Sequence, residues 1–113
     1  MIHEDVIILI PSYEPEENII FLTKQLSEEG YPLLVINDGS SRNYDAIFDE
    51  VEKYAKVISY DKNKGKGYAL KYGINHIRKN CPNVNYVITA DGDGQHSIKD
   101  IGKVYHKLTE TNE

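Results

Sequence analysis

Four short apolar runs, separated by segments of helical periodicity, constrain the fold of this sequence more than any other feature. The runs are DVIILI (5–10), LLVIN (33–37), KVISY (56–60) and YVITA (86–90). They do not alternate between apolar and polar residues, which is typical of strands buried on both faces. Parallel strands need long crossover connections, and the intervening helical segments supply them. The sequence therefore predicts an α/β fold, a Rossmann-like, doubly wound parallel sheet of about four strands with flanking helices.

Apolar residues recur at helical spacing in the segment that follows each run. Ser97 with Asp100 three residues later also predicts a capping box at the start of the last helix. The residues expected to face the sheet are Ile19, Leu22, Thr23 and Leu26 in the first helix, Tyr44, Ile47, Phe48, Val51 and Tyr54 in the second, Leu70, Ile74 and Ile77 in the third, and Ile98, Ile101, Val104 or Tyr105, and Leu108 in the fourth.

The chain has 113 residues, 40% of them hydrophobic, which is enough for one core and not for two. We therefore expect one domain, residues 1–113. The longest purely apolar run, VIILI, is too short to cross a bilayer, and no signal-peptide pattern opens the sequence. Cys81 is the single cysteine, which excludes an intramolecular disulfide. These features predict a cytoplasmic protein without a membrane segment.

The net charge of −5 argues against a nucleic-acid partner, because binding to a phosphate backbone requires a clustered basic face. The lysines are scattered along the sequence, with one local concentration in DKNKGKG (61–67). A small anionic ligand is still compatible with this charge if a metal ion bridges it to carboxylates.

Four unusual loops follow the four apolar runs. They are PSYEPEE (11–17), NDGSSRN (37–43), DKNKGKG (61–67) and DGDGQH (91–96). Glycine, asparagine and aspartate are common in any turn, so each loop alone is weak evidence. In doubly wound sheets, however, ligands bind beyond the carboxyl ends of the strands, where all four loops are expected to meet. Together they predict a ligand site.

Asp91 and Asp93 are two carboxylates one residue apart in the last of these loops. They repel each other unless a cation lies between them. An EF-hand is excluded, because His96 stands where that loop needs glycine. Two carboxylates, with Gln95 as a neutral oxygen ligand, suit Mg²⁺ or Mn²⁺ that completes its shell with phosphate oxygens and water. The competing interpretation is a pair of turn residues.

Glycines and lysines alternate in the third loop. Gly65 and Gly67 let the backbone approach a ligand at a helix start, where phosphate binds favourably, and Lys64 and Lys66 add positive charge. A dinucleotide fingerprint is excluded because Leu70 replaces its third glycine, and no Walker A motif occurs. Equally, the lysines could be solvated surface residues.

Asp38 follows the second run and Tyr13 the first. A carboxylate only accepts hydrogen bonds, so in a base pocket Asp38 would favour the ring N–H of uracil, thymine or guanine. A role in a turn or a helix cap is the alternative. Tyr13 offers a ring that could stack on the base.

The stretches IPSYEPEENI, VINDGSS, NKGKGYALKYGI and VITADGDGQH resemble, in this order, the nucleotide-binding half of family 2 glycosyltransferases with the GT-A fold. The last motif is similar to the D-x-D-G-Q-H of the dolichyl-phosphate mannosyltransferase branch. The resemblance implies a divalent metal, Mg²⁺ or Mn²⁺, and transfer with inversion from a nucleotide-diphospho-sugar to a lipid phosphate or saccharide hydroxyl. It implies metal ligands among Asp91, Asp93 and Gln95, and nucleotide-sugar contacts at Pro11, Tyr13, Glu14, Asp38, Gly65, Lys66 and Asp91.

Enzymes of this family continue past the D-x-D motif with elements that bind the acceptor and supply the catalytic base. The resemblance therefore implies that residues 1–113 are a donor-binding domain and that the base lies beyond residue 113. We expect the isolated chain to bind donor weakly, to transfer no sugar and to self-associate through uncovered sheet surface. The full-length enzyme could act at the cytoplasmic face of a membrane. A non-catalytic nucleotide-binding or assembly module is the rival interpretation.

Overall fold

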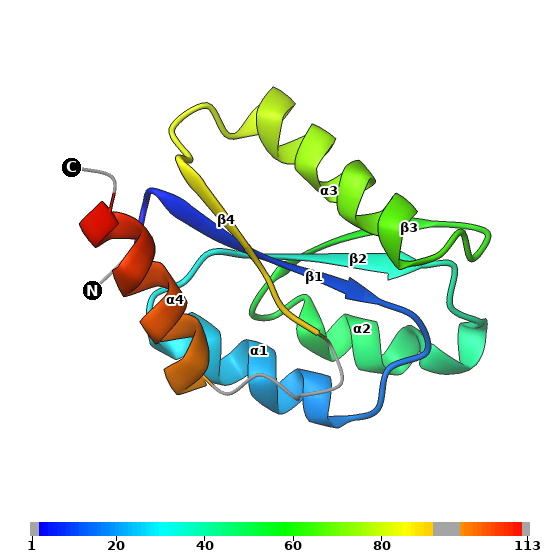
Figure 1. Cartoon of the computed structure of the whole chain (residues 1–113). Helices are drawn as coiled ribbons and strands as arrows, with labels where there is room; N and C mark the ends of the chain where they lie inside the picture. The colour runs from blue at the N-terminus through cyan, green and yellow to red at the C-terminus, as the bar shows by residue number, and fades with distance from the viewer. Residues whose placement is uncertain (1–2, 92–97, 112–113) are drawn as a thin grey trace.

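A computed structural model describes residues 3–91 and 98–111, which form one four-stranded parallel sheet with helices on both faces (Figure 1). The strands lie in the order β3-β2-β1-β4. This arrangement confirms the predicted α/β, doubly wound fold. In chain order the elements are β1 (Val6–Ser12), α1 (Asn18–Glu28), β2 (Leu33–Asp38), a 3₁₀ turn (Arg42–Tyr44), α2 (Asp45–Val51), β3 (Lys56–Tyr60), α3 (Lys66–Asn80), β4 (Tyr86–Thr89) and α4 (Ile98–Thr111).

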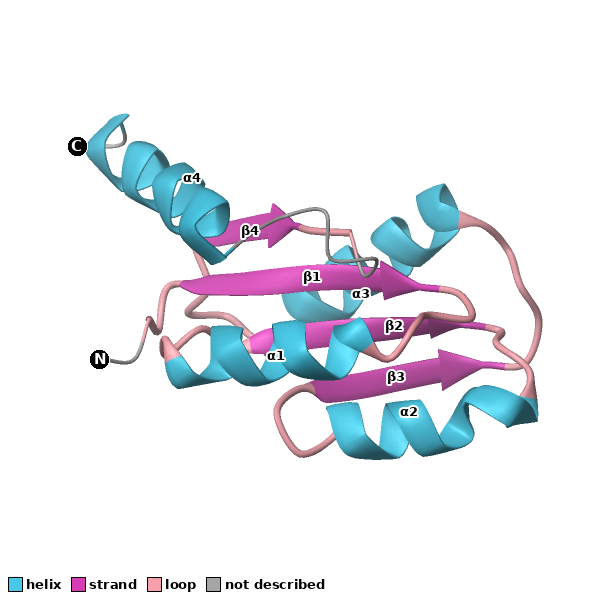
Figure 2. Cartoon of the chain, turned by 90° about the horizontal axis from the view of Figure 1, so that it is seen from below, coloured by secondary structure: helices cyan, strands magenta, loops and turns pink. Residues whose placement is uncertain are grey.

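Helices α1, α2 and α4 cover one face of the sheet, and α3 covers the other (Figures 1 and 2). Successive residues of a strand point to opposite faces, so β1 contributes to both cores. Ile8 and Ile10 pack toward α1, whereas Ile7 and Leu9 pack toward α3. Both cores need apolar side chains from the same strand. This requirement explains why residues 6–10 are all apolar.

Helix α3 lies closer to the sheet than the sequence indicates. Its buried residues are Ala69, Gly73 and Ile77, whereas Ile74, predicted to face inward, is 38% exposed. A Cβ atom on Gly73 would lie only 2.4 Å from Cδ1 of Leu9. The helix thus contacts the sheet through small residues, and this rotates its larger side chains outward. The prediction for Ile74 was wrong because helical spacing alone does not reveal a contact made by glycine and alanine.

The other helices agree better with the sequence. All four residues predicted on the inner face of α1 are buried. In α4, Tyr105 rather than Val104 packs against the core, and the predicted cap residue Ser97 lies outside the described residues. Helix α2 is shorter than expected, and Tyr54 lies after its end.

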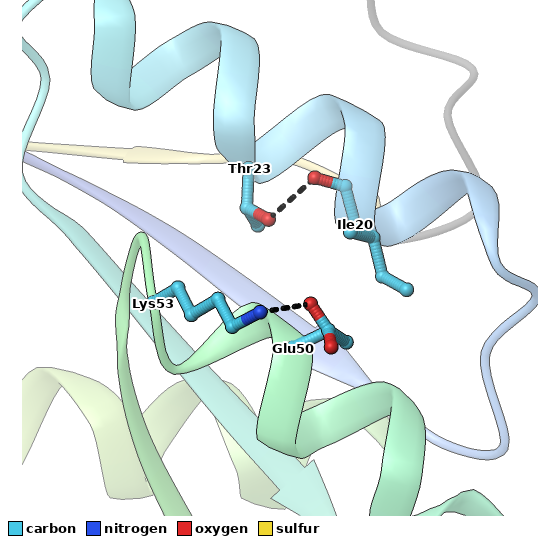
Figure 3. Close-up of polar contacts among 4 residues, drawn as sticks. All are labelled: Ile20, Thr23, Glu50 and Lys53. Atoms are coloured by element: carbon cyan, nitrogen blue, oxygen red, sulfur yellow. Dashed lines mark hydrogen bonds and ion pairs between the residues drawn. The ribbon is translucent and has the colours of Figure 1, made fainter.

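Figure 3 shows one polar contact within α1 and one at the end of α2. The buried hydroxyl of Thr23 donates to the carbonyl oxygens of Ile19 and Ile20, at 2.9 and 3.1 Å, so its burial leaves no unpaired donor. After α2, the ammonium of Lys53 lies 2.8 Å from a carboxylate oxygen of Glu50. Both side chains of that ion pair are exposed, so it adds little stability.

Strand β4 pairs with β1 alone among the described residues. Beside it, Val87, Ile88, Ile101, Val104 and Leu108 help to line a largely apolar groove of about 260 Å³ between β4 and α4. An open strand edge next to apolar surface favours association between chains. This agrees with the self-association expected from the sequence, which stays a prediction. Within the described part of the chain, no helix is long and apolar enough to span a membrane.

A tyrosine contact ties α4 to the start of the sheet, far from the carboxyl ends of the strands. The hydroxyl of Tyr105 donates to Oδ1 of Asp5 at 2.7 Å, and its ring meets those of His3 and Tyr31 edge-on. The hydrogen bond to Asp5, followed by burial, raises the pKa of Tyr105 to about 12.

Replacing Tyr105 by Phe should lower the free energy of unfolding by about 1 kcal/mol, because it removes this hydrogen bond and keeps the ring. The folded pKa of Tyr105 lies above the value of 10 expected when unfolded, so the stabilisation is complete below pH 10 and is lost as pH rises through about 12. Urea unfolding of both proteins across this range measures the effect. A constant difference between wild type and variant from pH 8 to 12 would contradict it.

Candidate functional site

The carboxyl ends of the four strands meet at one edge of the molecule, where the four loops singled out in the sequence begin. Strand β1 is central. The chain first proceeds from it through β2 to β3 and later returns to place β4 on its other side. Such a reversal of strand order opens a crevice between adjacent loops, and ligands of doubly wound sheets bind there.

The carboxylate of Asp38, at the end of β2, organises this edge. Asp38 is only 3% exposed, and each of its carboxylate oxygens accepts two hydrogen bonds. The donors are the Tyr60 hydroxyl (2.6 Å), the Asn63 side-chain amide (3.0 Å), and the backbone amides of Lys64 (2.9 Å) and Gly65 (3.0 Å). A carboxylate offers about four lone-pair positions, so all are in use. Asp38 thus fixes the loop between β3 and α3.

Gly39 brings the same two loops into direct contact. Its φ of +69° is unfavourable for other residues, and a Cβ atom there would lie 2.1 Å from the backbone nitrogen of Asn63. No shift of a side chain could relieve that clash, because the neighbouring atoms belong to the backbone. Asp38 and Gly39 together therefore hold the turn after β2 against the loop after β3.

A cavity of about 270 Å³ lies beside Asp38 and collects most of the residues that the sequence predicts for nucleotide-sugar binding. The hydroxyl oxygen of Ser12 is buried in its lining and has no hydrogen-bond partner among the described residues. A buried polar atom without a protein partner is rare unless it forms a hydrogen bond with a ligand or a water molecule. The residues around the cavity are Pro11, Ser12, Tyr13, Asp38, Asn63, Gly65, Lys66 and Asp91.

Glu14 lines a second, more polar cavity of about 560 Å³, which Tyr13 shares with the first. Glu14 has a φ of +46°, a strained value for a residue other than glycine. Its backbone amide donates to Oγ of Ser40 at 2.8 Å, which holds the loop after β1 against the turn after β2. Arg42 also faces this cavity and was not predicted. Tyr13 is 52% exposed between the two spaces, so its ring is accessible to a ligand.

Lys66 and Asp91 form an ion pair across the mouth of the smaller cavity, with 2.8 Å between Nζ and Oδ1. Both side chains reach solvent, so the pair contributes little to stability and its charges can respond to a ligand. Asp93 and Gln95 lie outside the described residues. Within the described part, no group of three potential ligands could hold a metal ion. The carboxylate of Asp91 at the cavity nevertheless suits a hard divalent cation.

Helix α3 begins at Lys66, directly after Gly65 with its φ of +95°. This agrees with the predicted helix start. However, the amides of Lys64 and Gly65 donate to Asp38, so these two do not face a phosphate group. The expectation for the loop needs that correction, because a carboxylate from within the protein already occupies these two donors.

Four functional candidates escaped the sequence analysis, namely Ser12, Arg42, Tyr60 and Asn63. Tyr60 is paired with Asp38 in the parallel register of β2 and β3, and burial, then its hydrogen bond to Asp38, raise its pKa well above the usual range. Only the strand register brings these two residues together. Asn63 carried a weak signal, since it stands in the glycine-lysine loop already singled out.

One family model and several known proteins are similar in sequence to this chain. The family model described as Glycosyl transferase family 2 matches residues 7–113. An uncharacterised protein of Methanocaldococcus jannaschii is 35% identical over 111 residues, which cover 95% of this chain and 48% of that protein. A UDP-N-acetylglucosamine–dolichyl-phosphate N-acetylglucosaminyltransferase of Methanococcus voltae is 28% identical over 119 residues, 91% and 47% of the two chains. A dolichyl-phosphate beta-glucosyltransferase of Saccharomyces cerevisiae is 27% identical over 117 residues, 90% and 34%. The chain spans less than half the length of each of these relatives.

Replacing Asp38 by Ala should accelerate hydrogen exchange at the amides of Lys64 and Gly65, because both lose their acceptor. The free energy of unfolding should fall by at least about 2 kcal/mol, since several donors are left unpaired. Tyr60→Phe is the matched control. It keeps the carboxylate, so exchange at the two amides should stay close to wild type and stability should fall by only about 1 kcal/mol. Unchanged exchange in Asp38→Ala would show that the carboxylate does not hold the loop.

Proposed function

Because the chain belongs to glycosyl transferase family 2, we propose that it is the donor-binding part of an enzyme that transfers a sugar from a nucleotide-diphospho-sugar. The observation that carries this proposal is the cavity at the carboxyl edge of the sheet. Six of the seven residues predicted to contact the nucleotide sugar line it, together with the Ser12 hydroxyl, which has no hydrogen-bond partner within the described part of the chain. A largely apolar cavity with a lysine-aspartate pair in its lining suits a ligand with a ring at one end and charge at the other.

The base end of the donor is assigned to Tyr13 and Asp38. The accessible ring of Tyr13 would stack on the base. Asp38 would accept a ring N–H, which favours uracil, thymine or guanine over cytosine and adenine. Its oxygens already accept four protein donors, so the ring N–H would share an oxygen. The resulting preference should lie at the weak end of the range for hydrogen bonds to charged groups.

The diphosphate end is assigned to Lys66 and to the loop that starts at Asp91. Asp91, Asp93 and Gln95 would hold Mg²⁺ or Mn²⁺, which supplies charge to stabilise the nucleoside diphosphate as it leaves. Lys66 now neutralises Asp91 at 2.8 Å and would exchange that partner for a phosphate oxygen of the bound donor. A charge that shifts toward the leaving group in this way lowers the barrier to transfer.

Two relatives carry the names of dolichyl-phosphate transferases, which supports a choice of acceptor. We propose a lipid phosphate as acceptor in the full-length protein. Its oxygen would attack the anomeric carbon as the bond from that carbon to the diphosphate breaks, which inverts the configuration. The described residues of this chain would position the donor, and the acceptor-binding residues would lie elsewhere in the enzyme.

Nucleoside diphosphate and metal should bind mutually, since the acidic loop repels a bare diphosphate and offers a bare cation too few ligands. Calorimetric titration of uridine diphosphate with Mn²⁺ and with EDTA measures this coupling. Asp93→Asn keeps the side-chain shape and removes the charge, so the Mn²⁺-dependent part of binding should disappear while circular dichroism stays unchanged.

Asp49→Asn is the control for this titration, because it removes one exposed carboxylate from α2, away from both cavities, and should leave binding intact. Nucleotide that binds equally well in EDTA would refute the metal assignment. An unfolded Asp93→Asn protein would instead make this aspartate a structural turn residue.

A further inference from the structure

Charge is distributed very unevenly over this chain. Residues 62–80 contain six of the 13 lysines and arginines and none of the 18 aspartates and glutamates. The rest of the chain therefore carries seven basic residues against 18 acidic ones. The local concentration of lysines noted in residues 61–67 thus continues into the next segment with Lys71, Arg78 and Lys79.

That element is α3, the only helix on its face of the sheet among the described residues (Figure 1). Its buried residues point to β1 and β2, so the opposite side of the helix is open to solvent. Lys71, Arg78 and Lys79 are exposed on that outer side. None of the acidic residues lies on α3, whereas the helices of the other face and the turns that flank them carry Glu17, Glu28, Glu29, Asp45, Asp49, Glu50, Glu52, Asp100 and Glu110. The layered architecture thus separates a basic surface from an acidic one.

Aromatic side chains are interleaved with these charges. Tyr68 and Tyr72 are 42% and 37% exposed, and their rings lie against each other and against Tyr60. The ammonium of Lys64 lies 4.7 Å from the centre of the Tyr68 ring. Tyrosine at the surface of a basic helix is typical of contacts with the headgroup region of a membrane, where its ring is apolar and its hydroxyl is hydrated.

We propose that the outer face of α3, defined by Tyr68, Lys71, Tyr72, Arg78 and Lys79 together with Lys64 of the preceding loop, docks on an anionic phospholipid membrane. Charge complementarity supports this partner, because a basic surface on an otherwise acidic chain is attracted in one orientation only. The choice of a membrane over another polyanion rests on the proposed function, in which the acceptor is a lipid phosphate.

The orientation also suits that acceptor. Helix α3 begins with Lys66, which lines the smaller cavity, so the basic surface continues directly from the candidate site. When α3 lies along the membrane, the carboxyl ends of the strands, where the candidate site lies, are held beside the lipid headgroups. A lipid phosphate could then reach the donor without leaving the bilayer.

Co-sedimentation of the chain with phosphatidylcholine vesicles, with and without phosphatidylglycerol and in the absence of nucleotide, tests the proposal. We expect binding only to the anionic vesicles, with steep weakening at high salt. The triple variant Lys71→Gln, Arg78→Gln, Lys79→Gln should bind about 100-fold more weakly, from about fivefold for each basic residue. None of the three touches either cavity, so its nucleotide binding should match wild type.

The matched control is Lys24→Gln, Lys53→Gln, Lys103→Gln, which removes the same charge from exposed positions on α1, after α2 and on α4. It should bind vesicles within a fewfold of wild type. Equal losses in the two triple variants would show that net charge, and not α3, drives binding, and would overturn the proposal. So would absence of binding to anionic vesicles, or binding to an oligonucleotide in their place. Because no nucleotide is present, these outcomes are independent of the proposed donor site.

Discussion

The buried carboxylate of Asp38 is the interaction on which the candidate site depends. A charge removed from water is tolerated only if hydrogen-bond donors replace the solvent, and here four donors do so. All four come from the end of β3 and the loop after it. Satisfying one aspartate therefore fixes the loop, the positive φ of Gly65 and the starting point of α3. Lys66 then lies 2.8 Å from Asp91, and both residues line the smaller cavity.

Much of this architecture could be predicted from the sequence, because burial on both faces leaves a clear pattern. β1 and β2 begin with the uninterrupted apolar runs VIILI and LLVI, which are buried, and the inner face of α1 follows directly from its spacing. The contact of α3 with the sheet left no such pattern. Gly73 and Ala69 make that contact because they are small. Small residues add little to an apolar periodicity, so the periodicity does not show which side of α3 is buried. The outward position of Ile74 follows from the same cause.

That the four polar loops meet could also be predicted, because the carboxyl ends of parallel strands lie at one edge of the sheet. Six of the eight residues around the cavity had been singled out in the sequence, whereas Ser12 and Asn63 had not, and the internal order of the cavity could not be predicted. The partners of Asp38 depend on strand register, which pairs Asp38 with Tyr60, and on the close approach of Gly39 to Asn63. Charge behaves similarly. The net value of −5 conceals the six basic residues of segment 62–80, and the position of α3, the only helix on its face of the sheet among the described residues, shows on which side of the molecule they lie.

The affinity of uridine, guanosine and cytidine diphosphates for wild type and for Asp38→Asn tests the central claim most directly. The account predicts that all three bind more weakly to the variant, because the loop loses part of its support. It also predicts that the uridine and guanosine forms lose about 1.5 kcal/mol more than the cytidine form, because only they present a ring N–H to the carboxylate. Unchanged affinity for all three would contradict the assignment of this edge as the donor site, and equal losses would restrict Asp38 to holding the loop.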